Sequence, residues 1–306
     1  EQDYKTIKDA GFDSVRMLVK WPSTALKKEP YTISEEFFAD IDKSVKLAVS
    51  QGLVVDLATD GVPTIQFPGT KSSDTIEQTE KAYLAIMGQV AEHYKDYSSN
   101  DVVLELLNEP FNVLGPDRLN QLYADTIALV RKTNPNRTLI VGPECLYSAA
   151  CIDTLRLPEN DRNIIVTIHD YEPGGFTAFN NGSTSWGGYD DMHMMNSDYY
   201  KLKAWSNENN RPITISEFGS TGKADINSRA SYASAQRSLA EMMGFSWMYF
   251  NFATDDPTFS SDFGIYNKKT EKWSQPLLEA LIPANKSADK LGPGIPGIAP
   301  PAGAAN

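Results

Sequence analysis

The chain has 306 residues, of which 41% are hydrophobic and 22% are charged, and its formal net charge is −12. This composition can bury a large core, and no apolar run approaches the roughly 20 residues that a membrane-spanning helix needs. The acidic balance excludes nucleic acid as an expected partner, because phosphate binding depends on cations. The first residues, EQDYKTIKDAG, contain no signal peptide.

Apolar strands alternate with amphipathic helices along the whole chain. Strands are predicted at 14–19, 53–58, 102–107, 138–142, 163–169, 212–217 and 245–252. Most are near-continuous apolar runs, which is typical of parallel strands covered on both faces. Helices are predicted at 35–50, 75–95, 118–133 and 228–243, with a further one before Gly11. Asp117 is the expected N-cap of the third, and Gly52 and Gly244 the expected stops of the first and fourth.

This βα rhythm predicts a parallel sheet, either an open doubly wound sheet or a closed (β/α)8 barrel. No G-x-G-x-x-G pattern follows any strand, which disfavours the open nucleotide-binding arrangement. Residues 1–284 are therefore expected to form one barrel domain. Residues 285–306 are rich in Pro, Gly and Ala and indicate a tail or linker, beyond which an additional module is plausible.

Two predicted strands end in a glutamate. The stretch VLELLNEPF stops abruptly at Asn108, Glu109 and Pro110, and ITISEFG ends in Glu217 before Gly219. In a barrel both acids lie at the carboxyl ends of the strands, where active sites are built. Two carboxylates across a glycosidic bond are the usual apparatus of glycoside hydrolysis, whereas a single strand-end Glu is more often a structural residue.

Other strand ends supply side chains suited to the same site. Arg16 lies within the first predicted strand, where a buried guanidinium needs a carboxylate partner. His169 and Tyr171 end the strand at 163–169, two residues apart, so their side chains are expected on the same side. Trp247 and Phe250 belong to an aromatic run, FSWMYFNF, and aromatic rings either fill cores or stack on sugars.

Cysteine and histidine usage gives less information. Cys145 and Cys151, in CLYSAAC, are either two small buried residues or a short-range disulfide of an exported protein, and their spacing leaves both readings open. His93, His169 and His193 show no ligand-like spacing. The sequence therefore predicts no metal and no cofactor.

The ordered set of motifs LLNEPF, VTIHDYEP and ITISEFG resembles glycoside hydrolase family 5, the cellulase family A of retaining (β/α)8 enzymes. Supporting matches are GFDSVRMLVKW near the start and FGIYN with KWSQPLLEALIP near the end, so the resemblance covers about residues 1–283. It implies that Glu109 is the acid/base and Glu217 the nucleophile. By the same resemblance Asn108 holds a substrate hydroxyl, Arg16 orients the nucleophile, and His169 and Tyr171 line the site.

The sequence departs from the family pattern at three places. The family commonly carries a histidine after its third strand. Here that end reads LATDG, and the stretch from Ala58 to Gly61 contains no histidine. A segment after the sixth strand reads FTAFNNG, 176–182, and Phe250 stands where the eighth strand usually carries Trp. All three positions are expected near the sugar, so they bear on the substrate more than on the reaction type.

The leading interpretation is a retaining endo-acting hydrolase of β-1,4-linked glucan, with mannan or another β-glucan as alternative substrates. A carbohydrate-binding barrel with impaired hydrolysis and an intracellular α/β enzyme are the other two hypotheses. The first places the protein outside the cell, with a β-linked polysaccharide or oligosaccharide as its partner.

The strand count is one short of a closed barrel. The helix before Gly11 follows a first strand in the family, and the residues that precede it here are too few to form one. A proline-rich tail cannot supply an inner strand, because proline lacks the backbone donor. We therefore expect a barrel without its first strand, in which strands 14–19 and 245–252 have unpaired edges.

Overall fold

A computed structural model describes residues 2–21, 29–62, 65, 75–111, 113–177, 184–256, 258–259 and 262–284. The chain divides into two units. The first comprises Glu1–Asp170 and Arg211–Ser216, and the second comprises Tyr171–Asn210 and Glu217–Asn306. The predicted tail at 285–306 lies outside the described residues.

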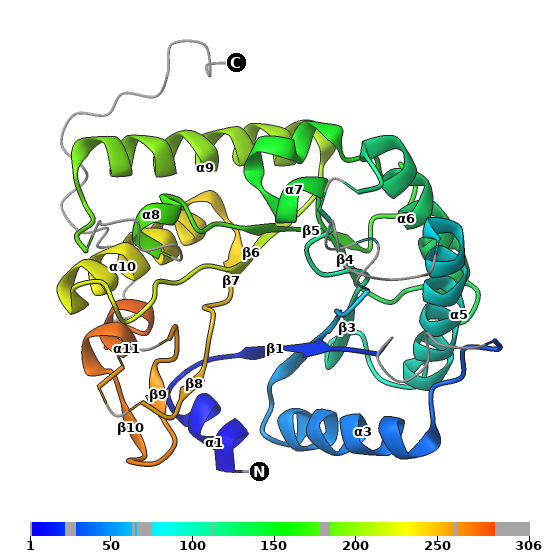
Figure 1. The fold of residues 1–306 in the computed structure, drawn as a ribbon, viewed down its shortest axis with the longest axis horizontal. Coiled ribbons are helices and arrows are strands. Elements are labelled where there is room, and N and C mark those ends of the chain that lie inside the picture. The colour runs from blue at the N-terminus through cyan, green and yellow to red at the C-terminus, as the bar shows by residue number, and fades with distance from the viewer. Residues whose placement is uncertain are drawn as a thin grey trace. The chain divides into compact units, whose positions relative to one another are not determined.

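Parallel strands of the main sheet follow one another in chain order (Figure 1). They are β1 (Ser14–Val19), β2 (Val54–Thr59), β3 (Val102–Glu105), β4 (Leu139–Val141), β5 (Ile164–His169) and β6 (Ile213–Glu217). Each of the first four pairs in parallel with the next, and Val166 N donates to Pro212 O at the start of β6. Their interiors are buried, with Val55, Leu57 and Leu104 at most 1% exposed, which explains the continuous apolar runs.

Helices of the first unit cover these strands from outside (Figure 1). They are α1 (Gln2–Asp9), α3 (Glu35–Ser50), α5 (Ile76–Tyr94) and α6 (Pro116–Arg131). The short helices α7 (Glu144–Tyr147) and η1 (Ala149–Thr154) follow β4 in the chain. The hydroxyl of Ser34 caps α3, and Thr75 with Gln78 forms a capping box at α5.

The predicted N-cap at Asp117 is wrong. Helix α6 begins at Pro116, and its N-cap is Gly115, whose φ is 72°. Proline at the first helical position lacks only a donor that would have no intrahelical partner, and its fixed φ suits the helix. Asp117 lies inside the first turn, where its charge favours the positive end of the helix dipole.

The second unit contains two long helices and a small separate sheet. Its helices are α8 (Gly174–Thr177), α9 (Tyr189–Asn209), α10 (Ile226–Met243) and α11 (Gln275–Leu281). After β7 (Ser246–Trp247) come β8 (Ala253–Thr254), β9 (Tyr266–Asn267) and β10 (Lys272–Trp273), which form a sheet of order β10-β9-β8. Within the described residues, no helix is long and apolar enough to cross a membrane.

The predicted strand at 245–252 is too long, because only Ser246 and Trp247 form β7. β7 is the last strand in the sheet order, so a single neighbour supports its ladder. β3 is also shorter than predicted and ends at Glu105. The strand at 14–19 is confirmed with both of its predicted ends.

β1 and β7 are the two ends of the strand order, and no eighth strand joins this sheet among the described residues. The repeat of parallel strands and helices is that of a (β/α)8 barrel that lacks one strand in the part of the chain described here. This confirms the predicted fold class.

Gly244 ends α10 with φ at 74°, as predicted from the sequence. A side chain in this left-handed conformation is strained, so Gly244→Ala should lower the free energy of unfolding by about 1 kcal/mol. Gly175→Ala is the matched control, because a Cβ there meets nothing within 4 Å and φ is not positive. Urea denaturation measures both variants, and equal losses would contradict the assignment.

Candidate active site

The backbone between Glu105 and Pro110 leaves the β-ladder and turns. Asn108 N still donates to Thr59 O at 2.7 Å, so the segment remains attached to the end of β2. Glu109 has φ at 43°, a left-handed conformation that is uncommon for residues other than glycine. The conformation of Glu109 therefore depends on contacts with its surroundings.

Arg16 joins β1 to this segment through charge-assisted hydrogen bonds. Its Nε and Nη2 donate to the two carboxylate oxygens of Glu105 at 2.7 and 2.6 Å, and Nη2 also donates to Asn108 Oδ1 at 2.8 Å. The amide nitrogen of Asn108 lies 3.4 Å from Asp60 Oδ1. The sequence required a carboxylate partner for Arg16, and Glu105 is that partner. The contacts fix which way the Asn108 amide faces.

His169 lies against Glu109 at the end of β5. Its Nδ1 is 2.7 Å from Glu109 Oε1, and its Nε2 is 3.1 Å from the hydroxyl of Ser216 in β6. In the tautomer that carries its hydrogen on Nδ1, the ring donates to the carboxylate and accepts a hydrogen bond from the Ser216 hydroxyl at Nε2. The ring of Tyr147 packs edge-on against the imidazole with centroids 5.0 Å apart. His169 is therefore held on three sides.

In the second unit, Tyr171 holds Glu217. Its hydroxyl donates to Glu217 Oε2 at 2.8 Å, and its backbone carbonyl accepts a hydrogen bond from the Thr177 hydroxyl. The Tyr171 ring also packs edge-on against Phe263. Glu217 is 6% exposed, so its carboxylate depends on such a donor for solvation.

Trp247 and Phe250 support the residue that follows Glu217. The Trp247 ring packs edge-on against Phe218, and its indole nitrogen donates to Glu241 Oε1 at 3.3 Å. Phe250 N donates to Phe218 O at 2.9 Å. Their contact with a sugar stays a prediction. Of the segment 176–182, residues 178–182 lie outside the described residues.

Sequence reasoning missed four polar residues around this site: Asp56, Asp60, Glu105 and Ser216. Asp56 and Glu105 are fully buried on neighbouring strands. The sequence did mark these two residues, since each is a charged residue inside an otherwise apolar strand. Asp60 follows β2, where the family pattern has a histidine, and only the fold brings it to Asn108.

Asp56 and Glu105 share one guanidinium. Arg16 hydrogen-bonds Glu105, while its Nε lies 3.8 Å from Asp56 Oδ2. Burial, and then the negative charge of Glu105, raise the pKa of the Asp56 carboxyl well above its ordinary value, although Arg16 acts in the opposite direction. Two buried carboxyl groups beside one cation favour a proton on one of them.

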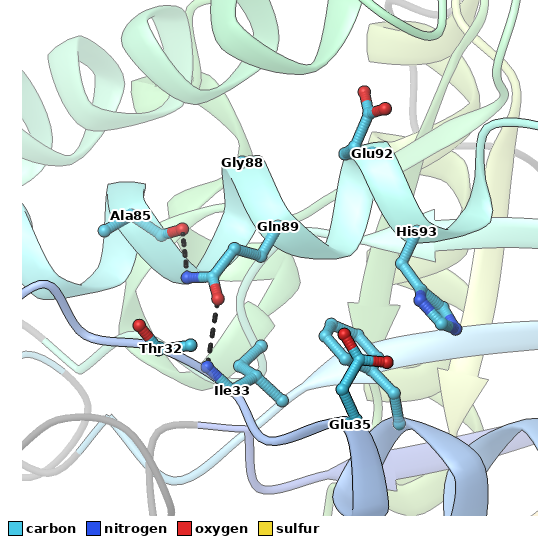
Figure 2. Close-up of a pocket in the computed structure, with 9 residues that line it drawn as sticks. Thr32, Ile33, Glu35, Ala85, Gly88, Gln89, Glu92 and His93 are labelled. Atoms are coloured by element: carbon cyan, nitrogen blue, oxygen red, sulfur yellow. Dashed lines mark hydrogen bonds between the residues drawn. The ribbon is translucent and has the colours of Figure 1, made fainter.

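A surface pocket of about 420 Å³ lies between α3 and α5 and contains none of the predicted site residues (Figure 2). Gln89 uses its side-chain amide to accept from Ile33 N and to donate to Ala85 O, as the figure shows. His93 stacks on Phe38 and bonds Asp42 at 3.0 Å. These polar groups hold α5 against its neighbours, so we assign the pocket a structural role.

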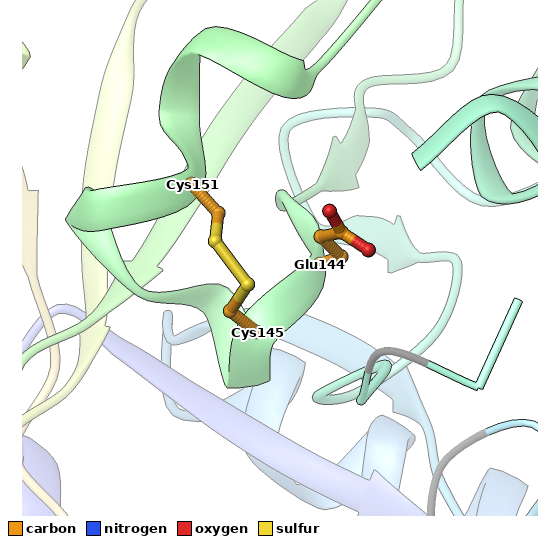
Figure 3. Close-up of side chains that lie close together, drawn as sticks. All are labelled: Glu144, Cys145 and Cys151. Atoms are coloured by element: carbon orange, nitrogen blue, oxygen red, sulfur yellow. A yellow bond between two sulfur atoms is a disulfide. The ribbon is translucent and has the colours of Figure 1, made fainter. Parts of the chain in front are cut away.

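Glu144, Cys145 and Cys151 lie close together, and residues of these types bind metals in other proteins (Figure 3). The two cysteines are joined in a disulfide, which decides between the two readings of the sequence. Neither sulfur is then a thiolate that a metal ion could bind. Burial raises the pKa of the Glu144 carboxyl.

The family Cellulase (glycosyl hydrolase family 5) matches residues 1–256 of the chain. The chain belongs to this family. Endoglucanase H of Acetivibrio thermocellus is 29% identical over 285 residues, which cover 92% of this chain and 30% of that protein. Endoglucanase A of Ruminococcus albus is 27% identical, over 89% of this chain and 79% of that protein.

Solved structures of similar proteins agree with the fold. The cellulose synthase subunit Z (CcsZ) from Clostridioides difficile has a TM-score of 0.82 and 33% identity, over 92% of this chain and 91% of that one. Endoglucanase Cel5A from Thermotoga maritima has a TM-score of 0.82 and 31% identity, over 92% and 89%. The chain spans about a third of the length of Endoglucanase H and of Cellulase/esterase CelE from Acetivibrio thermocellus.

The raised pKa of Asp56 predicts a pH-dependent stability in this family 5 chain. The folded protein holds the Asp56 proton more tightly than the unfolded chain, so ionisation lowers stability as the pH rises above the ordinary Asp range, about 4. Asp56→Asn, which carries no titrating group, should be more stable than the wild type at pH 8 by on the order of 1 kcal/mol. At pH 4 the two should differ less.

Urea denaturation at both pH values checks this expectation. Asp40→Asn, on the exposed face of α3, is the control and should show no such widening. A difference in stability between Asp56→Asn and the wild type that is constant with pH would contradict the raised pKa of the Asp56 carboxyl.

Proposed function

We propose that the chain is a retaining endo-acting β-glycoside hydrolase that cleaves β-1,4-linked glucan. The observation that carries the proposal is the pair of strand-end glutamates in a family 5 chain, each held by its own aromatic or imidazole partner. Glu109 is held by His169, and Glu217 by Tyr171. Two glutamates at barrel strand ends are what a double displacement requires.

In the first step Glu217 attacks the anomeric carbon and forms a covalent glycosyl ester, while the bond to the leaving oxygen breaks. Glu109 gives its proton to that oxygen. In the second step Glu109 takes a proton from water, whose oxygen attacks the anomeric carbon and releases Glu217. Each carboxyl group returns to its starting state, and the product keeps the anomeric configuration of the substrate.

The hydrogen bonds around the glutamates suit these roles. Tyr171 orients the Glu217 carboxylate by donating to Oε2. His169 Nδ1 orients the Glu109 carboxyl group, and Arg16 fixes the amide of Asn108 toward a substrate hydroxyl. Chain connectivity also supports the pairing of Glu109 with Glu217. Ser216 is the hydrogen-bond partner of His169, and it directly precedes Glu217 in the sequence.

Relatives support a β-linked glucan or mannan as the substrate. Structures of Cel5A from Thermotoga maritima include complexes with cellobiose and with mannotriose. Mannan and other β-glucans are therefore the second substrate candidates. We place the protein outside the cell, since the Cys145–Cys151 disulfide is typical of exported chains. An additional module beyond residues 285–306 is also part of this proposal.

A reducing-sugar assay on carboxymethyl cellulose, mixed-linkage glucan and mannan tests the activity, and we expect the highest rate on a β-1,4-glucan. Proton NMR of the first product should show the β-anomer, because two inversions restore the starting configuration. Release of the α-anomer first would overturn the double displacement. Binding without any release of sugar would favour the carbohydrate-binding alternative.

Variants of the two glutamates should separate their roles. Glu217→Gln should abolish turnover of every substrate, because no covalent ester forms. Glu109→Ala should reduce kcat/KM on cello-oligosaccharides by roughly 10²- to 10⁴-fold and spare kcat/KM on a dinitrophenyl cellobioside, whose leaving group needs no proton.

Azide should accelerate the Glu109→Ala variant and yield a β-glycosyl azide, because this anion attacks the ester without a general base. Glu36→Gln, on the exposed face of α3, is the matched control and should retain full activity. Equal losses of kcat/KM on both substrates in Glu109→Ala would argue against its assignment as the acid.

A further inference from the structure

Three consecutive residues after β4 adopt left-handed backbone conformations. Cys145, Leu146 and Tyr147 have φ at 65°, 60° and 62°, although none of them is glycine. L-residues avoid this region unless other contacts compensate for the cost. The surrounding structure must therefore hold this turn in place.

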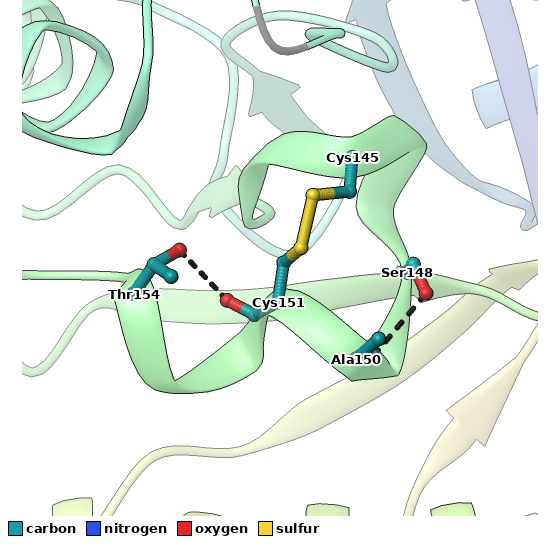
Figure 4. The surroundings of a disulfide bond; sticks show 5 residues. All are labelled: Cys145, Ser148, Ala150, Cys151 and Thr154. Atoms are coloured by element: carbon teal, nitrogen blue, oxygen red, sulfur yellow. Dashed lines mark hydrogen bonds between the residues drawn. A yellow bond between two sulfur atoms is a disulfide. The ribbon is translucent and has the colours of Figure 1, made fainter.

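The Cys145–Cys151 disulfide closes the turn (Figure 4). Ser148 N donates to Cys145 O at 3.1 Å, and the Ser148 hydroxyl accepts from Ala150 N, so the chain reverses directly into η1. The Cys151 carbonyl accepts from the Thr154 hydroxyl at 2.8 Å, which fixes the far side of the bridge. One end of the turn is thus tied covalently to a hydrogen-bonded helix.

The turn contacts the chain on both sides of Asn108 and Glu109. The Tyr147 hydroxyl donates to Leu107 O, the carbonyl just before Asn108. Leu146 N donates to Pro110 O at 3.1 Å, just after Glu109. Two successive residues of one turn therefore hold the two ends of the segment that carries the proposed acid/base.

Tyr147 is also built tightly into the fold. It is fully buried, and its ring lies where a side chain at position 142 would be, since a Cβ on Gly142 would come within 2.3 Å of it. The same ring packs against the imidazole of His169, the partner of Glu109. Tyr147 thus contacts both the backbone beside Glu109 and the side chain that orients its carboxyl group.

We propose that Tyr147, held in its left-handed turn by the Cys145–Cys151 disulfide, is a positioning residue for Glu109. This inference rests on the proposed function. The β-ladder ends at Glu105, and Asn108 N donates to Thr59 O at the end of β2. Beyond it, the turn supplies the hydrogen bond at Pro110 that the ladder no longer provides.

The test compares Tyr147→Phe and the double variant Cys145→Ser/Cys151→Ser with Tyr199→Phe. Tyr199 is equally buried, and its hydroxyl donates to Gln236 between α9 and α10, outside the proposed machinery. All three lose an internal contact, so their melting temperatures should fall. Only the first two should lose kcat/KM on cello-oligosaccharides, by roughly 10- to 100-fold, because small misplacements of a reacting group are costly.

Substrates with different leaving groups distinguish a misplaced acid from a general loss of protein stability. A misplaced acid slows bond cleavage only where the leaving oxygen needs a proton, so kcat/KM on a dinitrophenyl cellobioside should stay within about threefold of the wild type. A loss that is equal on both substrates, or a Tyr147→Phe variant with wild-type kcat/KM on both, would overturn the inference. If the wild type cleaves no β-glucan or mannan, the proposed function itself fails before any variant is compared.

Discussion

The ion pair between Arg16 and Glu105 sits inside the strands of the first unit, where Arg16 is 6% exposed in its side chain and Glu105 not at all. A buried charge is tolerable only when a partner of opposite charge and good geometry meets it. The two-pronged contact satisfies the guanidinium and leaves one of its N–H groups directed at Asn108. The ion pair therefore joins β1 to β3 across β2, in addition to the backbone hydrogen bonds that each of them makes with β2.

Where β3 ends, side-chain hydroxyls take over hydrogen bonds that a neighbouring strand would otherwise make. The strand ends at Glu105, and although Leu106 N and Asn108 N still donate to the neighbouring strands, two buried tyrosines take up the carbonyls that follow. Tyr83 donates to Leu106 O and Tyr147 to Leu107 O, so consecutive carbonyls are satisfied from α5 and from the disulfide-closed turn. Leaving the ladder turns Glu109 out of the sheet while its backbone stays hydrogen-bonded, which a buried chain requires.

Much of the fold followed from local pattern. Continuous apolar runs predicted β1 to β6, and Pro110 predicted the abrupt end that leaves Glu109 outside the strand. Helix α9 was missed although Met195, Tyr199 and Leu202 are buried at helical spacing. Exposed Tyr189 and Met194 lie off that face and obscure the apolar pattern in the sequence.

The candidate site residues that the sequence proposed are those that a motif singles out. Glu109, Glu217 and Asn108 stand at strand ends, where a motif and a fold class are enough to single them out. No motif singles out Glu105 and Asp56 as partners of Arg16. The register of three strands brings these side chains together. The left-handed turn at 145–147 was beyond reach, because its residues carry no glycine or asparagine that signals positive φ.

The Cys145–Cys151 bridge joins residues only six apart in the chain. Closing so small a loop removes little freedom from the unfolded chain, about 2 kcal/mol in the chain-entropy account. Its effect on global stability is therefore modest, while its effect on the local backbone is direct. In the proposed function, the bridge therefore matters more for the position of one carboxyl group than for the folding of the chain as a whole.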